Sequence, residues 1–272
     1  MAALWPEVVA HFAKRHGPPP GRGGVILGMG SLGAGHLTPQ SALDLIVVYD
    51  PLDADQSDGP RPLPTRSYYA RLTQAMITAI TTQTAQGRLY EADMRLRPSG
   101  NQGPVATSWP SFQRYQREDA WLWEHLALVR AAVVAGPDDV ARDIETLRED
   151  IIKQPRELGN VLAELADMRA RIAAAKQPAA IWDAKIGPGR LQDIELLAQA
   201  GAVLTGEVRA GVRFGLEACV AADLLSDADA QHLAQTLALL WAVQIASRLL
   251  STKAGALDTL GAGGQDVLLR AV

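Results

Sequence analysis

A glycine-rich turn near the start of the chain separates two apolar segments. The turn covers residues 28–35 and follows a short apolar run at residues 24–27, which is expected to be a strand. After the turn, residues 43–49 place apolar side chains on both faces of a strand, which is typical of a strand in the middle of a sheet. We therefore expect a sheet built around these two strands, with the glycine turn between them.

Other segments of the first half add helices and one more strand. Apolar residues at helical spacing predict helices at residues 4–13, 68–82 and 111–135. Residues 88–97 alternate instead, with apolar side chains on one face and charged side chains on the other. This two-residue period predicts a strand with one buried face.

Beyond Pro137 the strand signals stop, and only helical patterns follow. They cover residues 138–153, 157–176, 191–201, 206–222 and 227–250. The pattern of residues 261–272 is ambiguous. The change near Gly136 predicts an α+β domain at residues 1–136 and an all-helical bundle at residues 137–272.

Composition excludes several classes of protein. The 272-residue chain has a formal net charge of −4, which argues against non-specific nucleic-acid binding. A disulfide framework is excluded because there is one cysteine, Cys219, which lies in an apolar stretch and is expected in the core. No segment reaches about 18 uninterrupted apolar residues, and the N-terminus lacks the pattern of a secretory signal. We expect no membrane contact and a cytoplasmic location.

The glycine turn fits two different nucleotide-binding motifs. Gly28, Gly30 and Gly33 match the G-x-G-x-x-G of a dinucleotide-binding fold, and Asp50 ends the next strand. Such a fold needs a complete helix between the two strands, and the connection at residues 31–42 is too short and too rich in glycine and proline. The dinucleotide interpretation is therefore disfavoured.

The second motif is similar to that of polymerase-β-like nucleotidyltransferases. These enzymes have a Gly-Ser turn, about ten residues, and then Asp-x-Asp at the start of a strand, which corresponds here to Gly30, Ser31, Ala42 and Asp44. Backbone amides of a small-residue loop can approach phosphate oxygens, and acids two residues apart on a strand face the same side. A further acid must come from a neighbouring strand, and Asp93 fits this role.

Longer segments resemble one family, the glutamine synthetase adenylyltransferase of bacteria, a bifunctional adenylyltransferase and adenylyl-removing enzyme. The resemblance covers most of residues 24–200 and is most specific at residues 90–100, Tyr-Glu-Ala-Asp-Met-Arg-Leu-Arg-Pro-Ser-Gly. It continues through residues 115–131 and, in the helical half, through Asp183, Lys185, Gly187, Gly189 and residues 193–195. The family has two nucleotidyltransferase modules. Residues 97–100 and 121–125 look more like the C-terminal, adenylylating module, so the chain is expected to hold one module of a longer enzyme.

The resemblance implies an activity and a set of site residues. The reaction would be adenylyl transfer from ATP to a tyrosine hydroxyl of glutamine synthetase, assisted by Mg²⁺ or Mn²⁺ and regulating nitrogen assimilation. PII signalling proteins are a further possible partner. The implied catalytic metal ligands are Asp44 and Asp93, and the implied nucleotide-binding residues are Gly30, Ser31, Arg95 and Arg97.

The sequence departs from the family at three positions. Ala42 replaces the first acid of Asp-x-Asp, His36 replaces an acidic residue after the turn, and Arg190 replaces a glycine in the helical half. Because alanine cannot coordinate a metal, the first departure predicts impaired transfer. A catalytically inactive nucleotide- or partner-binding module is the alternative, and a relative of the PII uridylyltransferases is another.

Several side chains have two interpretations at this point. Asp93 is either a metal ligand or an ion-pair partner of Arg95 or Arg97. The two arginines in turn either bind phosphate or pair with neighbouring acids. Trp121 and Trp123 are expected in the core rather than as platforms for a nucleobase.

Overall fold

The computed structural model describes residues 1–178, 182–250 and 261–271. The chain divides into two compact units. The first comprises Met1–Leu37 and Ser41–Ile151, and the second comprises Thr38–Gln40 and Ile152–Val272. Each unit is described by itself.

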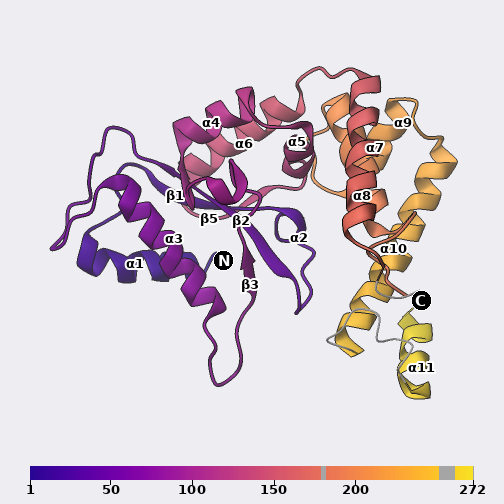
Figure 1. The fold of residues 1–272 in the computed structure, drawn as a ribbon, viewed down its shortest axis with the longest axis horizontal. Helices are drawn as coiled ribbons and strands as arrows, with labels where there is room; N and C mark the ends of the chain where they lie inside the picture. The colour runs from indigo at the N-terminus through magenta and orange to yellow at the C-terminus, as the bar shows by residue number, and fades with distance from the viewer. Residues whose placement is uncertain (179–181, 251–260, 272) are drawn as a thin grey trace. The chain divides into compact units, whose positions relative to one another are not determined.

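The first unit is built on a small mixed sheet (Figure 1). Its strands are β1 (Gly23–Gly28), β2 (Ala42–Asp50), β3 (Glu91–Asp93), β4 (Ala106–Ser108) and β5 (Ala132–Ala135). The strand order is β3-β2-β1-β5, and β4 also pairs with β2. β1 runs antiparallel to β2 and β5, whereas β3 and β4 run parallel to β2. The two apolar segments that flank the glycine turn are therefore the central strands, as predicted.

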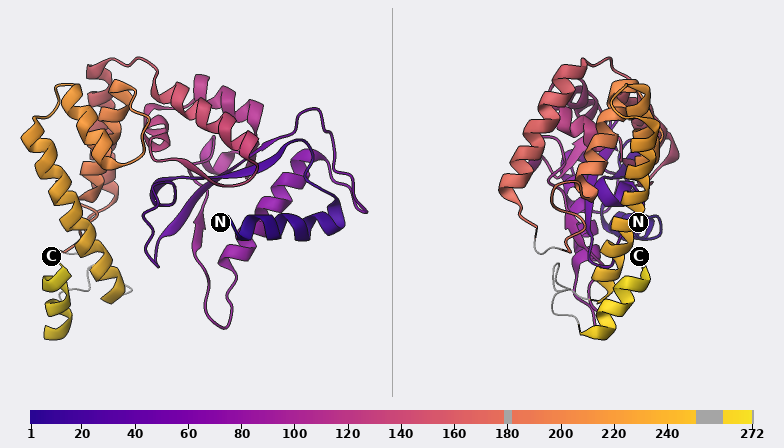
Figure 2. Two further views of the ribbon diagram at one scale, coloured as in Figure 1. Left: turned by 180° about the vertical axis from the view of Figure 1, so that it is seen from behind. Right: turned by 90° about the vertical axis from the view of Figure 1, so that its right-hand side faces the viewer.

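Helices cover both faces of this sheet, as the left view shows (Figure 2). α1 (Leu4–His16) and α3 (Thr65–Thr81) pack against the face that carries Leu45 and Val47. α4 (Trp109–Glu118) and α6 (Asp138–Ile152) pack against the face that carries Ile46 and Val48. Because side chains of β2 alternate between two cores, the strand is buried on both faces.

The alternating segment at residues 88–97 forms a much shorter strand than expected. β3 covers Glu91–Asp93 only. The chain turns directly afterwards: the N–H of Arg97 donates to the carbonyl of Met94 at 3.3 Å, and that of Gly100 to the carbonyl of Arg97 at 2.8 Å. A short 3₁₀ helix, Gly100–Gln102, follows this turn. The alternation continues in sequence past Asp93, but the backbone groups after it bond locally and not to β2.

The prediction of one long helix at residues 111–135 is wrong, because this segment forms two helices and a strand. α4 ends at Glu118, α5 covers Leu122–Leu128, and β5 pairs with β1. Glu124 accepts a hydrogen bond from the backbone N–H of Trp121 at 3.0 Å, so α5 starts anew at that point. A short apolar run such as 132–135 fits a helix or a strand equally well, and its pairing with β1 decides the outcome.

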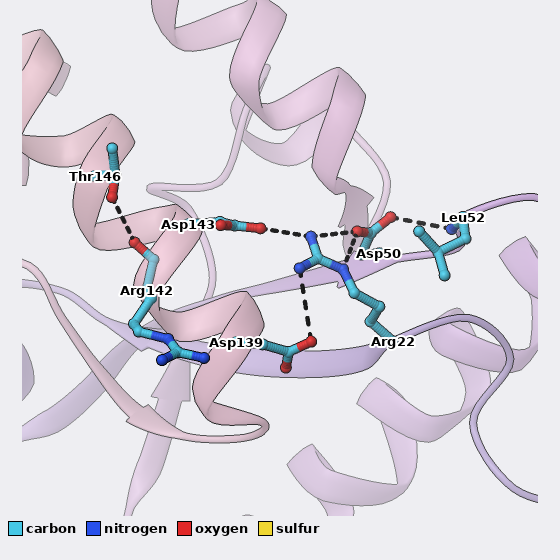
Figure 3. A network of polar contacts seen from close by, with 7 residues as sticks. All are labelled: Arg22, Asp50, Leu52, Asp139, Arg142, Asp143 and Thr146. Atoms are coloured by element: carbon cyan, nitrogen blue, oxygen red, sulfur yellow. Dashed lines mark hydrogen bonds and ion pairs between the residues drawn. The ribbon is translucent and has the colours of Figure 1, made fainter.

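The boundary between the two units lies at Ile151, not at Gly136 as expected. α6 belongs to the first unit because Val140, Ile144, Leu147 and Ile151 enter the core on one face of the sheet. A charged cluster adds to this attachment (Figure 3). The guanidinium of Arg22 contacts Asp50 and Asp143 at 2.6 Å each and Asp139 at 3.6 Å.

In the second unit, the described residues from 158 onward form helices and the loops that join them, and no strands. The helices are α7 (Leu158–Ala175), α8 (Leu191–Thr205), α9 (Val212–Ala221), α10 (Asp227–Leu250) and α11 (Ala262–Ala271). The ambiguous tail is therefore helical at α11. α8 and α9 pack closely because glycines lie at their contact: a Cβ on Gly201 would lie 2.5 Å from Cys219 Sγ, and one on Gly215 would lie 2.3 Å from the carbonyl of Ala198.

α10 is the one described helix that is long and apolar enough to cross a membrane, judged by length and composition alone. A core helix of a soluble protein passes the same test. The expected absence of membrane contact stays a prediction.

Candidate functional site

The two predicted metal-binding acids lie on adjacent strands in direct register. In the parallel pairing of β2 with β3, Asp44 is opposite Asp93. Register partners of a parallel pair project from the same face of a sheet. For Asp44 this is the face that also carries Ile46 and Val48. The prediction that the two strands are neighbours with both acids on one face is confirmed.

The glycine turn lies against Asp44. Gly30 begins the short helix α2 (Gly30–Gly33) and has a φ of +52°, and a Cβ at this position would lie 2.6 Å from Asp44 Oδ2. Just before it, the N–H of Met29 donates to the backbone carbonyl of Asp44 at 2.8 Å. Both the positive φ and the close carboxylate require glycine here. The structure thus brings together Gly30, half-buried Ser31 and the acid of β2.

The same turn excludes a dinucleotide-binding fold. That fold needs parallel strands joined by a crossover helix. Here β1 and β2 are antiparallel, and the only helix in their connection is the four-residue α2. The sequence-based preference against this fold is therefore confirmed.

Asp93 forms an ion pair with Arg95. The sequence leaves open whether Asp93 is an ion-pair partner or a metal ligand, and the structure shows the ion pair. Arg95 Nε lies 3.0 and 2.9 Å from the two carboxylate oxygens of Asp93, and Nη2 lies 2.5 Å from Oδ2. These hydrogen bonds hold the pKa of Asp93 below its ordinary value. The same pair raises the pKa of Arg95, and Asp44 adds a further Coulomb attraction. The Arg95 side chain is 75% exposed, so this ion pair is open to solvent.

Arg97 has a different position from Arg95. Its Nη1 donates to the carbonyl of Met94 at 2.7 Å, and its Nε donates to the carbonyl of Gly103 at 3.3 Å. These bonds tie together the loop that follows β3. The contribution of Arg97 to Asp93 is a minor electrostatic one that lowers the carboxyl pKa.

Position 42 faces an acid on the neighbouring strand. Ala42 is the register partner of Glu91 in the pairing of β2 with β3. Glu91 is bound by Arg88 at 2.5 Å and is exposed. Sequence reasoning missed this juxtaposition, because the register between two strands cannot be deduced from either strand alone.

The donor set fits a hard divalent cation only in part. Carboxylate oxygens are the ligands that Mg²⁺ prefers, and Asp44 and Asp93 present them side by side. Among the residues that the structure describes, no group of three histidine, cysteine or acidic side chains is placed to hold a metal ion. Asp44 and Asp93 are thus a pair of carboxylates and not a three-acid cluster.

Residues that follow the loop support the sheet rather than lie beside the acids. Glu124 is buried and accepts hydrogen bonds from the hydroxyl of Tyr115 at 2.9 and 3.1 Å, which joins α4 to α5. Trp121 and Trp123 are 67% and 41% exposed, so their expected core positions are wrong. Trp121 precedes α5 and Trp123 lies in its first turn, after the end of α4 at Glu118.

In the second unit, the residues that match the family motif form hydrogen bonds and ion pairs in and around one loop. Asp183 accepts hydrogen bonds from the backbone of Lys185 and Ile186 at 3.0 Å. Asp193 pairs with Arg169 at 2.8 Å. Arg190, which replaces a glycine of the family, donates hydrogen bonds to the carbonyls of Asp183 and Ile186 and so links the two ends of the loop.

Comparisons with known proteins agree with the resemblance. A sequence profile of the glutamate-ammonia ligase adenylyltransferase family matches residues 1–147. A bifunctional glutamine synthetase adenylyltransferase/adenylyl-removing enzyme of Mesorhizobium japonicum is 44% identical over 278 residues, which cover 99% of this chain and 28% of that protein. The enzymes of the same name from Brucella suis and Agrobacterium fabrum are 46% and 45% identical over 74% and 71% of this chain, and 20% of each relative is covered.

The chain thus spans about a quarter of the length of the curated relatives it matches. The family match covers more than half of the chain and includes every residue of the carboxylate site. The chain belongs to the glutamate-ammonia ligase adenylyltransferase family.

Proposed function

We propose that this chain is an adenylyl-transferring module that acts on a tyrosine hydroxyl of glutamine synthetase. The observation that carries the proposal is the register of Asp44 with Asp93 directly beside the Gly30 turn. The relatives of this sequence are named for the same activity. Its loop at residues 97–100 favours the C-terminal, adenylylating module, and a cytoplasmic location follows from such a substrate.

Each site residue has a proposed task. Backbone amides at Gly30 and Ser31 bind the triphosphate, since they lie at the start of α2 in a turn of small residues that a phosphate can approach. Asp44 and Asp93 hold Mg²⁺ or Mn²⁺, which when bound neutralises phosphate charge and polarises the reacting α-phosphate. Arg95 leaves Asp93 and binds phosphate oxygens, and Arg97 holds the loop that carries it. The tyrosine oxygen then bonds to the α-phosphorus while pyrophosphate leaves.

Ala42 makes this a weak transferase. One carboxylate fewer on the β2 face lowers the affinity for the cation that the reaction needs. The second candidate is a module that binds ATP or a protein partner, such as glutamine synthetase or a PII protein, without turnover. Ala42 is the observation that favours it.

Transfer of label from α-labelled ATP to glutamine synthetase, with Mg²⁺ or Mn²⁺, tests the proposal. We expect slow transfer by this chain and none by Asp44→Asn. Asp53→Asn, which changes an exposed acid of a loop, serves as the matched control and should transfer at the rate of the parent chain. Transfer that survives Asp44→Asn would contradict the proposed site.

Nucleotide binding separates the alternatives. Calorimetric titration that shows ATP binding without any transfer supports the binding module. Competition between ATP and UTP tests the uridylyltransferase alternative, because a uridylyl-transferring relative would prefer UTP.

A further inference from the structure

A cavity of about 380 Å³ lies at the edge of the first unit's sheet. Its wall includes β4, the start of α4, and Arg66 of α3. Tyr49, which also lines it, follows Asp44 by five positions in β2, and at the rise of a strand this is roughly 16 Å along the sheet. At this wall the cavity is therefore separate from the carboxylate pair, which does not line it; its opposite wall includes Pro98 and Ser99 of the loop after β3.

The charged side chains around this cavity are mostly cationic. Arg66 and Arg114 both line it, and neither forms an ion pair with any residue that the structure describes. Asp119 is the acid in the lining. Burial raises the pKa of Tyr49, and the positive charge of Arg66 partly offsets this effect. In a chain of net charge −4, two such guanidinium groups at one hollow are a local positive site.

Hydrogen-bond donors without protein acceptors add to the positive charge. α4 is ten residues long, and Ser108 at its N-cap makes no side-chain cap. Its hydroxyl instead donates to that of Ser111 at 2.9 Å, so the N–H groups of Trp109 and Ser111 are left without a side-chain acceptor, whereas Pro110 between them has no N–H. Thr107, which also lines the cavity, is 4% exposed, and its hydroxyl oxygen has no hydrogen-bond partner among the described residues. A buried hydroxyl without a partner is uncommon in a folded protein, and this one belongs to a residue of the cavity wall.

We propose that this cavity binds a phosphate dianion, either inorganic phosphate or the phosphate group of a small phosphomonoester. A planar guanidinium fork binds two oxygens of a tetrahedral anion, and a helix N-terminus donates to a third. The volume suits a small metabolite. Two arginines opposed by Asp119 leave a net charge of about +1 at the cavity, which offsets half the charge of a phosphate dianion and leaves no surplus for a polyanion.

Titration calorimetry of the full chain with inorganic phosphate, at constant ionic strength set with chloride, tests this site. We expect saturable binding that becomes about tenfold weaker in Arg66→Gln and in Arg114→Gln. Arg71→Gln is the matched control, because Arg71 is an exposed arginine of α3 outside the cavity lining. Absence of saturable binding, or equal affinity in all three variants, would overturn the proposal.

Thr107→Val separates a binding role from a structural one. Valine keeps the shape of threonine and removes the hydroxyl that has no partner among the described residues, so the variant should melt at the same temperature or higher. We expect it nevertheless to bind phosphate more weakly. A variant with unchanged phosphate affinity would remove Thr107 from the site and with it the strongest sign of a ligand.

Two further experiments ask which phosphate compound binds and whether the cavity binds it independently of the carboxylate pair. Tighter binding of glycerol 3-phosphate than of inorganic phosphate assigns the cavity to a phosphomonoester, and equal binding assigns it to free phosphate. Asp93→Asn should bind phosphate as the parent chain does, because the carboxylate pair lies elsewhere on the sheet. Loss of phosphate binding in Asp93→Asn would place the anion at the nucleotide site and contradict the proposal.

Discussion

Position 42 carries a methyl group where the resemblance implies a carboxylate. We predict that Ala42→Asp raises adenylyl transfer by roughly 10²–10³, which corresponds to about 3–4 kcal/mol of transition-state stabilisation. The physical reason is that the new acid would lie two residues from Asp44 on the same face of β2, opposite Glu91 and diagonal to Asp93. Transfer of α-labelled ATP to glutamine synthetase by the two chains, side by side, measures the effect. Equal rates would mean that position 42 is not a metal-binding position.

A second residue-scale prediction concerns the single cysteine. Cys219 is fully buried, and burial raises the pKa of its thiol to about 11. Because a raised pKa lowers the thiolate fraction at a given pH, the native chain at pH 8 should react with iodoacetamide a few hundredfold more slowly than the unfolded chain. Gln231→Cys, which places a thiol at an exposed position of α10, should react rapidly and provides the positive control. Equal rates before and after unfolding would show that Cys219 is accessible.

At the site, the sequence predicts the face of each acid but not its contacts. The two-residue period of a strand is a property of the backbone, so it places Asp44 on the face of residue 42 and Asp93 on the charged face of its own segment. That these two faces coincide depends on the pairing of β2 with β3. The pairing of Asp93 with Arg95 depends on where the chain turns after β3, and that turn is made by backbone bonds which leave no periodic signal. The opposition of Ala42 and Glu91 depends on register in the same way.

At the scale of elements, α6 is attached to the sheet by a charged cluster as well as by its apolar side. Arg22 lies between the buried carboxylate of Asp50 and two acids of α6 (Figure 3). We predict that Arg22→Met lowers the free energy of unfolding by about 1–3 kcal/mol, because Asp50 keeps its buried charge and loses its main partner. Urea denaturation followed by circular dichroism measures the change.

Arg142→Met is the control for this prediction. Arg142 is an exposed residue of α6 that forms no ion pair with the described residues, and it is drawn beside the cluster in Figure 3. Its replacement should change stability by less than about 0.5 kcal/mol. Two variants of equal stability would mean that the Arg22 cluster contributes nothing measurable.

Helices and strands are predicted well where the periodicity of their own apolar residues determines the secondary structure. They are predicted poorly where pairing with another strand determines it. β2 is buried on both faces, and its composition alone predicts a strand. β5 is four residues of alanine and valine, and only its bonds to β1 make it a strand. The same limit explains why one expected helix is in fact α4, α5 and β5.

At the scale of the whole molecule, the type of an element does not decide the unit to which it belongs. The sequence predicts a boundary at Gly136, where strands stop, yet the first unit continues to Ile151. α6 is a helix like those that follow it, but its apolar side completes the core on one face of the sheet. A boundary set by packing cannot be predicted from the change from strands to helices alone.

Truncation tests this boundary. We predict that residues 1–152 fold alone with a cooperative thermal transition, because both cores of the sheet lie within them. Residues 1–136 should not fold, because they lack Val140, Ile144, Leu147 and Ile151, each of which stabilises the core by about 1.5–3 kcal/mol when buried. Their combined loss, roughly 6–12 kcal/mol, is comparable to the whole stability of a domain. Near-ultraviolet circular dichroism and thermal melting compare the two fragments. A cooperative transition in the shorter fragment would return the boundary to Gly136 and make α6 dispensable to the nucleotidyltransferase unit.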